Sequence, residues 1–211
     1  TYFVSDYPII LLDGRIIGSV ANFQEATEIE KLEKKYRQIQ TAGLIAKNKF
    51  ENIIGNSKAV TSTIKKAKAY ALVDSTILLY GETGSGKELF AQSIHNHSER
   101  KFGPFIAINC AALPESLLES ELMGYEEGAF TGARKGGKIG LIELAHNGTL
   151  FLDEVNHIPA SIQARMLRVV QEKQVMRLGG ERVIPVDVRI MTATNANLKE
   201  MVKEHKFRED L

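Results

Sequence analysis

The sequence has little cysteine and no excess of charge, and each of these shortages excludes a class of protein. Its one cysteine, Cys110, cannot build an internal disulfide framework, which favours the reducing cytoplasm. Lys and Arg number 27 against 26 Asp and Glu, so the chain lacks the basic excess of a nucleic-acid binder. No apolar run approaches the roughly 20 residues of a membrane span, and no charged-then-apolar leader opens the chain. We therefore expect no membrane contact.

The composition that remains is that of an ordinary soluble protein, with 44% hydrophobic and 25% charged residues in 211. This length accommodates one full domain and a piece of another. Because the chain begins at Thr1 instead of Met, we expect it to be part of a longer protein.

The first 49 residues read as that smaller piece. Apolar stretches at 8–12 and 16–20 flank Asp13 and Gly14, a dipeptide that favours a tight hairpin turn. Since two strands alone are only marginally stable, we assign residues 1–26 to the end of a larger sheet. Apolar residues then recur at three- and four-residue steps, which predicts a helix within residues 25–49. A coiled-coil linker (residues 27–49) and a surface helix both fit this stripe.

Beyond Phe50 the pattern changes to apolar strands that alternate with longer amphipathic segments. This alternation is typical of an α/β fold with a parallel sheet, whose strands are buried on both faces. Strands are predicted at 76–80, 105–109, 149–153 and 186–194, and helices near 57–73, 87–97, 114–122, 161–172 and 196–204.

A glycine-rich loop follows the first of these strands and leads into an apolar-periodic helix, the context that a phosphate-binding loop requires. Its backbone N–H groups and the helix start would face phosphate oxygens, and Lys87 would reach the terminal phosphates. Glu88 replaces the Ser or Thr that normally offers a hydroxyl to Mg²⁺, so the metal must rely more on phosphates, water and a second carboxylate motif. The predicted loop consists of Gly81, Glu82, Thr83, Gly84, Ser85, Gly86, Lys87 and Glu88.

Polar residues close the other strands, and two of them are adjacent acids. Asp153 and Glu154 would stand at the carboxyl edge of the sheet, beside the phosphate loop. There Asp153 would hold a hydrated Mg²⁺ and Glu154 would polarise the attacking water. Asn109 and Asn195 end two further strands, where an amide can hydrogen-bond the γ-phosphate, the water or Glu154. The alternatives are helix-capping acids and a plain turn-forming asparagine at position 109.

A second loop sets one aromatic residue, Phe130, among small residues. Such a stretch cannot bury much of itself, and an exposed aromatic tip is typical of a docking surface. By physics alone, a Phe130 that folds back into a local core is an equal alternative. The loop consists of Gly128, Ala129, Phe130, Thr131, Gly132 and Ala133.

Together these motifs closely resemble the central AAA+ domain of bacterial sigma-54-dependent transcriptional activators. The Gly-Ala-Phe-Thr-Gly-Ala string is nearly private to that family, and Glu88 matches the family's usual departure from the phosphate-loop pattern. The resemblance covers residues 50–211 and includes the strings at 50–57, 81–88, 109–112, 119–122, 128–133, 149–154 and 207–211. Residues 1–26 resemble, more weakly, the end of a PAS sensory domain.

The resemblance implies an ATP- and Mg²⁺-dependent ATPase that assembles into a hexameric ring and opens the closed complex of sigma-54 RNA polymerase. Phe130 and Thr131 would contact sigma-54, Asn109 would restrain Glu154, and Asn195 would sense the nucleotide. Arg208 would reach the γ-phosphate of the neighbouring subunit. A helical lid and a DNA-binding helix-turn-helix, which such activators carry, do not occur within these residues, so DNA contact is expected only through a further domain and hydrolysis is expected to be slow.

Three other functions are each consistent with some of these motifs. Another remodelling or DNA-handling AAA+ ATPase would share the fold and hydrolysis, but the residue 128–133 string argues against it. A small-molecule kinase would have little use for Glu154 as a water-orienting base. A non-hydrolysing sensory or dimerisation fragment fits the first 49 residues.

Overall fold

The computed structural model describes residues 2–10, 16–25 and 44–211, and the chain divides into two compact units, 1–43 and 44–211. In the first unit, β1 (Tyr2–Ile10) and β2 (Ile16–Glu25) pair antiparallel, which agrees with the predicted hairpin. The Asp13-Gly14 turn and residues 26–43 of the predicted linker helix lie outside the described residues.

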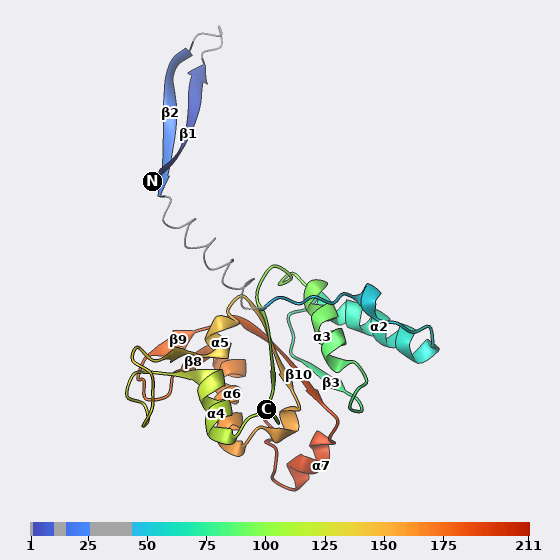
Figure 1. Cartoon of the computed structure of the whole chain (residues 1–211). Coiled ribbons are helices and arrows are strands. Elements are labelled where there is room, and N and C mark those ends of the chain that lie inside the picture. Colours follow the sequence, from blue (N-terminus) through green and yellow to red (C-terminus); the bar gives the residue numbers. More distant parts are fainter. Residues whose placement is uncertain (1, 11–15, 26–43) are drawn as a thin grey trace. The chain divides into compact units, whose positions relative to one another are not determined.

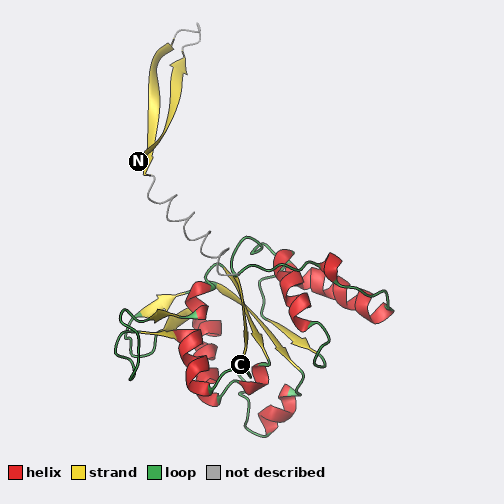
Figure 2. Cartoon of the chain, viewed as in Figure 1, coloured by secondary structure: helices red, strands yellow, loops and turns green. Residues whose placement is uncertain are grey.

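A parallel sheet of four strands forms the centre of the second unit, in the order β3, β10, β7, β4. All four strands lie where the sequence predicts them. Their bounds are Ile77–Tyr80 for β3, Phe105–Asn109 for β4, Gly148–Asp153 for β7 and Val188–Thr194 for β10. Figure 2 shows them as yellow arrows between red helices.

Helices cover both faces of this sheet (Figure 1), because the strand residues alternate between two apolar layers. On β7, Phe151 packs into the layer with α2 and α3, whereas Leu150 and Leu152 pack into the layer with α4 and α6. The helix bounds are Lys58–Ala71 for α2, Lys87–Asn96 for α3, Glu115–Met123 for α4, Leu141–Leu144 for α5, Ala160–Glu172 for α6 and Leu198–Lys203 for α7. The predicted α/β sandwich is therefore confirmed.

Short elements connect these layers. They are η1 (Phe50–Asn52), β5 (Gly124–Tyr125), β6 (Lys138–Ile139), η2 (Val155–His157), β8 (Gln174–Met176) and β9 (Val183–Pro185). The pairs β5–β6 and β8–β9 are antiparallel and stand apart from the central sheet.

One prediction is wrong at residues 44–49, where the apolar stripe predicts a helix that extends to Lys49. They are not helical. Side chains of α3 satisfy their backbone instead: Gln92 Oε1 accepts from Lys47 N and Asn48 N, at 3.0 Å each. Asn96 Nδ2 donates to Ala46 O at 2.9 Å. The segment thereby packs on the second unit, with which it is grouped.

Within the described residues, no helix is both long enough and apolar enough to cross a membrane.

Candidate functional site

The glycine-rich loop joins the end of β3 to the start of α3, as predicted. Gly84 and Gly86 adopt left-handed backbone conformations, with φ of 80° and 83°, which glycine adopts without strain. Gly86 is the residue before the helix and offers no side-chain cap, so the first N–H groups of α3 remain available. Such a helix start favours bound anions.

Lys87 is the first residue of α3 and lies folded across its own loop. Its Nζ donates to Gly81 O at 3.1 Å and to Glu82 O at 3.0 Å. The next residue, Glu88, is exposed, and its Oε1 accepts from Gln92 Nε2 at 3.0 Å. The loop therefore offers N–H groups and one ammonium to an anion, with a carboxylate where a hydroxyl is the usual group.

The two acids stand at the end of β7. Asp153 Oδ1 accepts from the backbone N of Glu154 at 3.0 Å. Glu154 adopts the left-handed conformation, with φ of 52° and ψ of 49°, which is uncommon for a residue with a side chain. Its Oε2 is buried and has no hydrogen-bond partner. A strained carboxylate with an unpartnered buried oxygen is typical of a functional group and not of a cap.

The amide of Asn195 reaches the phosphate loop. β10 lies beside β3, and Asn195 Nδ2 donates to Thr83 Oγ1 at 3.1 Å. Thr194, one residue earlier, donates to Asn156 Oδ1 at 2.7 Å, a contact that sequence reasoning missed. The only available signal was a polar residue at a strand end.

Asn109 pairs with Asp153 in the β4–β7 register, so it stands at the same edge as the acids. Its Oδ1 accepts from Ala111 N at 2.9 Å, as in a turn-forming asparagine. No hydrogen bond joins Asn109 and Glu154 in this structure, where both residues are described. The restraint of Glu154 by Asn109 thus stays a prediction.

Cys110 follows Asn109 and is buried beside the same acid. Its backbone N donates to Asp153 O at 2.9 Å. Burial, and to a lesser degree the charge of Asp153, raises the pKa of the Cys110 thiol to about 12. The thiol therefore stays protonated and unreactive at neutral pH.

Arg208 lies after α7, and its side chain makes no hydrogen bond or salt bridge with residues 81–88, Asp153 or Glu154 of its own chain. Its guanidinium binds the Asp210 carboxylate, with distances of 2.8 Å from Nε and 2.6 Å from Nη2. The pair is exposed, so it adds little to stability. The structure does not bring Arg208 together with the other predicted site residues.

Phe130 combines both sequence alternatives. One edge packs against Tyr125, with ring centroids 5.0 Å apart at 64°, yet 46% of the residue remains exposed. A turn closed by Ala133 N and Phe130 O holds the loop tip.

The base of this loop rests on residues that sequence reasoning missed. Arg177 binds Glu143 at 2.7 Å and Glu126 at 3.2 Å. A Cβ added to Gly179 would lie 2.7 Å from the Cβ of Ala129, so this glycine permits close approach. Ala129 of the loop therefore packs directly on Gly179, and Arg177 binds Glu126 just before the loop.

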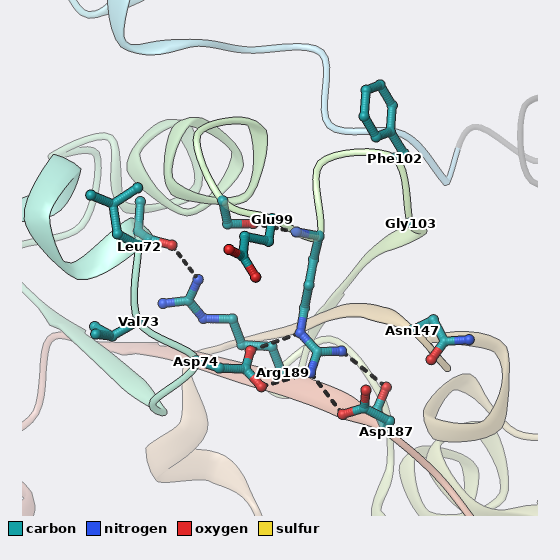
Figure 3. Close-up of a pocket in the computed structure, with 12 residues that line it drawn as sticks. Leu72, Val73, Asp74, Glu99, Phe102, Gly103, Asn147, Asp187 and Arg189 are labelled. Carbon is teal, nitrogen blue, oxygen red and sulfur yellow. Dashed lines mark hydrogen bonds and ion pairs between the residues drawn. The ribbon is translucent and has the colours of Figure 1, made fainter.

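Two of the cavities adjoin the sheet. One, of about 460 Å³, begins at the phosphate loop and is lined by Val60, Thr63, Tyr80, Lys87 and Phe90 among others. The other, of about 500 Å³, lies where β4, β7 and β10 begin (Figure 3).

Ion pairs and hydrogen bonds between residues of the chain line the second cavity. Arg100 bridges Asp74 at 2.6 Å and Asp187 at 2.7 Å. Arg189 donates to the last carbonyls of α2, at 2.7 Å for Tyr70 O and 3.1 Å for Ala71 O. Asp74, Arg100 and Asp187 are therefore paired with one another, and the Arg189 guanidinium is bound by backbone carbonyls.

Comparison with known proteins matches residues 53–211 to the family described as the sigma-54 interaction domain. The "Signal-transduction and transcriptional-control protein" of Clostridium beijerinckii is 48% identical over 99% of this chain and 32% of its own length. The "Nif-specific regulatory protein" of Herbaspirillum seropedicae is 51% identical over 96% and 38%. "Regulatory protein AtoC" of Escherichia coli is 48% identical over 89% and 40%. The chain thus spans about a third to two fifths of these relatives.

Solved structures share the fold. NtrX from Brucella abortus, crystallised in complex with ATP, has a TM-score of 0.69 and 38% identity over 75% of this chain and 34% of its own. The P-loop NTPase domain of an E. coli sigma-54 activator has a TM-score of 0.50 and 18% identity over 74% and 89%, which shows the fold alone.

Proposed function

Because the chain belongs to the sigma-54 interaction domain family, we propose that it binds ATP with Mg²⁺, hydrolyses it, and uses the energy to remodel the closed complex of sigma-54 RNA polymerase. The names of several relatives support a role in transcriptional control, among them the transcriptional activator RocR of Bacillus subtilis.

ATP binding is assigned to residues 81–88. The left-handed glycines and the uncapped start of α3 present N–H groups to the phosphates. Lys87 exchanges the carbonyls of Gly81 and Glu82 for the terminal phosphates, whose charge makes a stronger hydrogen bond. The relative NtrX has been crystallised with ATP and with ADP, which supports this assignment.

Mg²⁺ is assigned to the space between the phosphates and Asp153. Within the described residues no group of three or more His, Cys, Asp or Glu is placed to hold a metal. Mg²⁺ usually binds through one or two carboxylates, phosphates and water, so this donor set suits it. The bound ion would neutralise charge on the phosphates, and Asp153 would hold it through water.

Hydrolysis is assigned to Glu154, and its buried, unpartnered Oε2 carries the proposal. A carboxylate in that state accepts a proton from water that it orients for in-line attack. Asn195, already bound to Thr83 of the loop, would respond to the nucleotide, and Asn109 would restrain Glu154 before the nucleotide is in place.

Work on the partner is assigned to the loop at residues 128–133, where Phe130 and Thr131 would grip sigma-54. We propose a hexameric ring in which Arg208, exposed and outside its own site, completes the site of the adjacent subunit. DNA would be contacted through a further domain of the whole protein.

Two variants test the proposal. Lys87→Ala should weaken binding of a fluorescent ATP analogue at least about tenfold, because the phosphates lose their ammonium. Glu154→Gln should bind the analogue as wild type does but release phosphate at least about a hundredfold more slowly. The exposed Glu181→Gln is the matched control and should change neither.

Each alternative predicts another result. A small-molecule kinase would transfer phosphate to an acceptor in preference to water, and a sensory fragment would release none. If Lys87→Ala binds the ATP analogue as tightly as the wild-type protein does, the assignment of ATP binding to residues 81–88 is refuted.

A further inference from the structure

Gln163 is a polar residue in the apolar face of α6. Its neighbours on that face, Ile162, Met166 and Val169, belong to the core, and Gln163 itself is fully buried with 0% exposure. A buried amide is costly unless its groups are paired. The hydrogen bonds of the Gln163 amide therefore decide whether its burial is stable.

Three hydrogen bonds satisfy the Gln163 amide. Its Nε2 donates to Lys206 O at 3.1 Å, and its Oε1 accepts from Arg208 N at 2.8 Å. The second Nε2 hydrogen serves Ile158 O at 2.8 Å. One side chain thus joins two segments that are far apart in sequence.

The first two bonds bracket Phe207, as a neighbouring strand would. Phe207 packs into the core with 9% exposure. The backbone N of Lys206 and that of Phe207 both donate to Met201 O, in the last turn of α7. With both sides of Phe207 held, the direction in which Arg208 leaves the core is fixed, and its side chain is 42% exposed.

The third bond reaches the segment that carries Glu154. Ile158 directly follows η2, whose turn begins where His157 N donates to Glu154 O at 3.0 Å. A shift of Glu154 that moves this turn would also displace Ile158 O, the oxygen to which Gln163 is bound.

We propose that Gln163 is a positioning residue that links the Glu154 segment to Arg208, so that the arginine a subunit offers its neighbour is placed according to the state of its own site. This inference rests on the proposed function, since it takes Arg208 as the group that completes an adjacent site. A purely structural Gln163 would stabilise the chain without acting through Arg208.

The test uses Gln163→Met, which keeps the length of the side chain and removes all three hydrogen bonds. Gln171→Met, at an exposed position of the same helix, is the matched control. Gln163→Met should lower kcat for ATP hydrolysis by about tenfold or more while the affinity for a fluorescent ATP analogue stays within about twofold. Gln171→Met should match wild type in both.

A double-variant comparison separates positioning from stability. In an Arg208→Ala background, Gln163→Met should cause no further loss of kcat, because the residue through which it acts is gone. Multiplying losses would overturn the inference, and so would a kcat of Gln163→Met equal to that of Gln171→Met. A wild-type chain without ATP hydrolysis would instead overturn the proposed function.

Gln163→Glu provides a second variant in case the Met substitution impairs folding. A protonated glutamic acid offers one O–H donor and one acceptor in nearly the same place, whereas the ionised form loses the donor. Its kcat relative to wild type should therefore rise as the pH falls from 8 to 6. A ratio that does not change with pH, or variants at this position that unfold at every pH, would overturn the inference.

Discussion

His95 should make the stability of this protein sensitive to mild acid. It lies on α3, which begins at Lys87, and its Nδ1 is 2.9 Å from Thr149 Oγ1 on β7, the strand that ends at Asp153. The residue is 1% exposed. Burial, helped by the charge of Arg189, lowers the pKa of His95 to about 4.

The direction and size of the effect follow from this pKa. An unfolded histidine binds a proton below about pH 6.5, but the folded chain keeps His95 neutral down to about pH 4. The free energy of unfolding therefore falls as the pH drops from about 6.5 towards 4. Above about pH 6.5 the stabilising contribution of neutral His95 is fully present. Linkage puts the loss at about 1.4 kcal/mol at pH 5.5 and about 2.5 kcal/mol at pH 4.5.

Urea unfolding followed by circular dichroism at pH 7, 5.5 and 4.5 measures this loss. In His95→Gln, which cannot be protonated but keeps an amide near Thr149, the drop between pH 7 and 4.5 should be smaller than in wild type by about 2.5 kcal/mol. His157→Gln, an exposed position, should retain the wild-type drop. Equal drops in all three proteins would refute the assignment of acid sensitivity to His95.

Three further predictions concern the loop, the thiol and a buried arginine. Gly179→Ala, whose Cβ would meet Ala129 at 2.7 Å, should weaken sigma-54 binding several-fold with little change in ATP hydrolysis; Gly136→Ala has a similar φ but open space, and a similar loss there would contradict the contact. Because burial raises its pKa to about 12, Cys110 should be alkylated by iodoacetamide at pH 8 about a hundredfold more slowly in the folded than in the urea-unfolded chain, as mass spectrometry would measure. Arg189→Met should lower the free energy of unfolding at pH 7 by about 3 kcal/mol in urea titrations, since buried carbonyls at the end of α2 lose their donors, and a loss below about 1 kcal/mol would refute this reasoning.

Strands, helices and loops could be predicted from the sequence where the residues of a segment themselves decide its structure. The strand at 149–153 could be predicted because a strand buried on both faces is apolar throughout. The loop at 81–87 could be predicted because its glycines and Lys87 have a purpose only between a strand and a helix. Five predicted helices of the second unit likewise appear within a few residues of their expected bounds.

The exception is residues 44–49, which local reasoning placed in a helix. Their backbone groups bind Gln92 and Asn96, which lie more than 40 residues further along the chain. No pattern within residues 44–49 indicates that distant side chains bind their backbone.

The sequence by itself determined that this chain has an α/β fold with a phosphate loop, a pair of acids after a buried strand and an aromatic loop, because these depend on residues close together in the chain. Only the tertiary structure decided that β10 lies beside β3 and brings Asn195 to Thr83. It also placed Gly179 under Ala129 and joined Gln163 to both Ile158 and Arg208. These contacts arise from strand order and packing between distant segments, which depend on the whole folded core and leave no local trace.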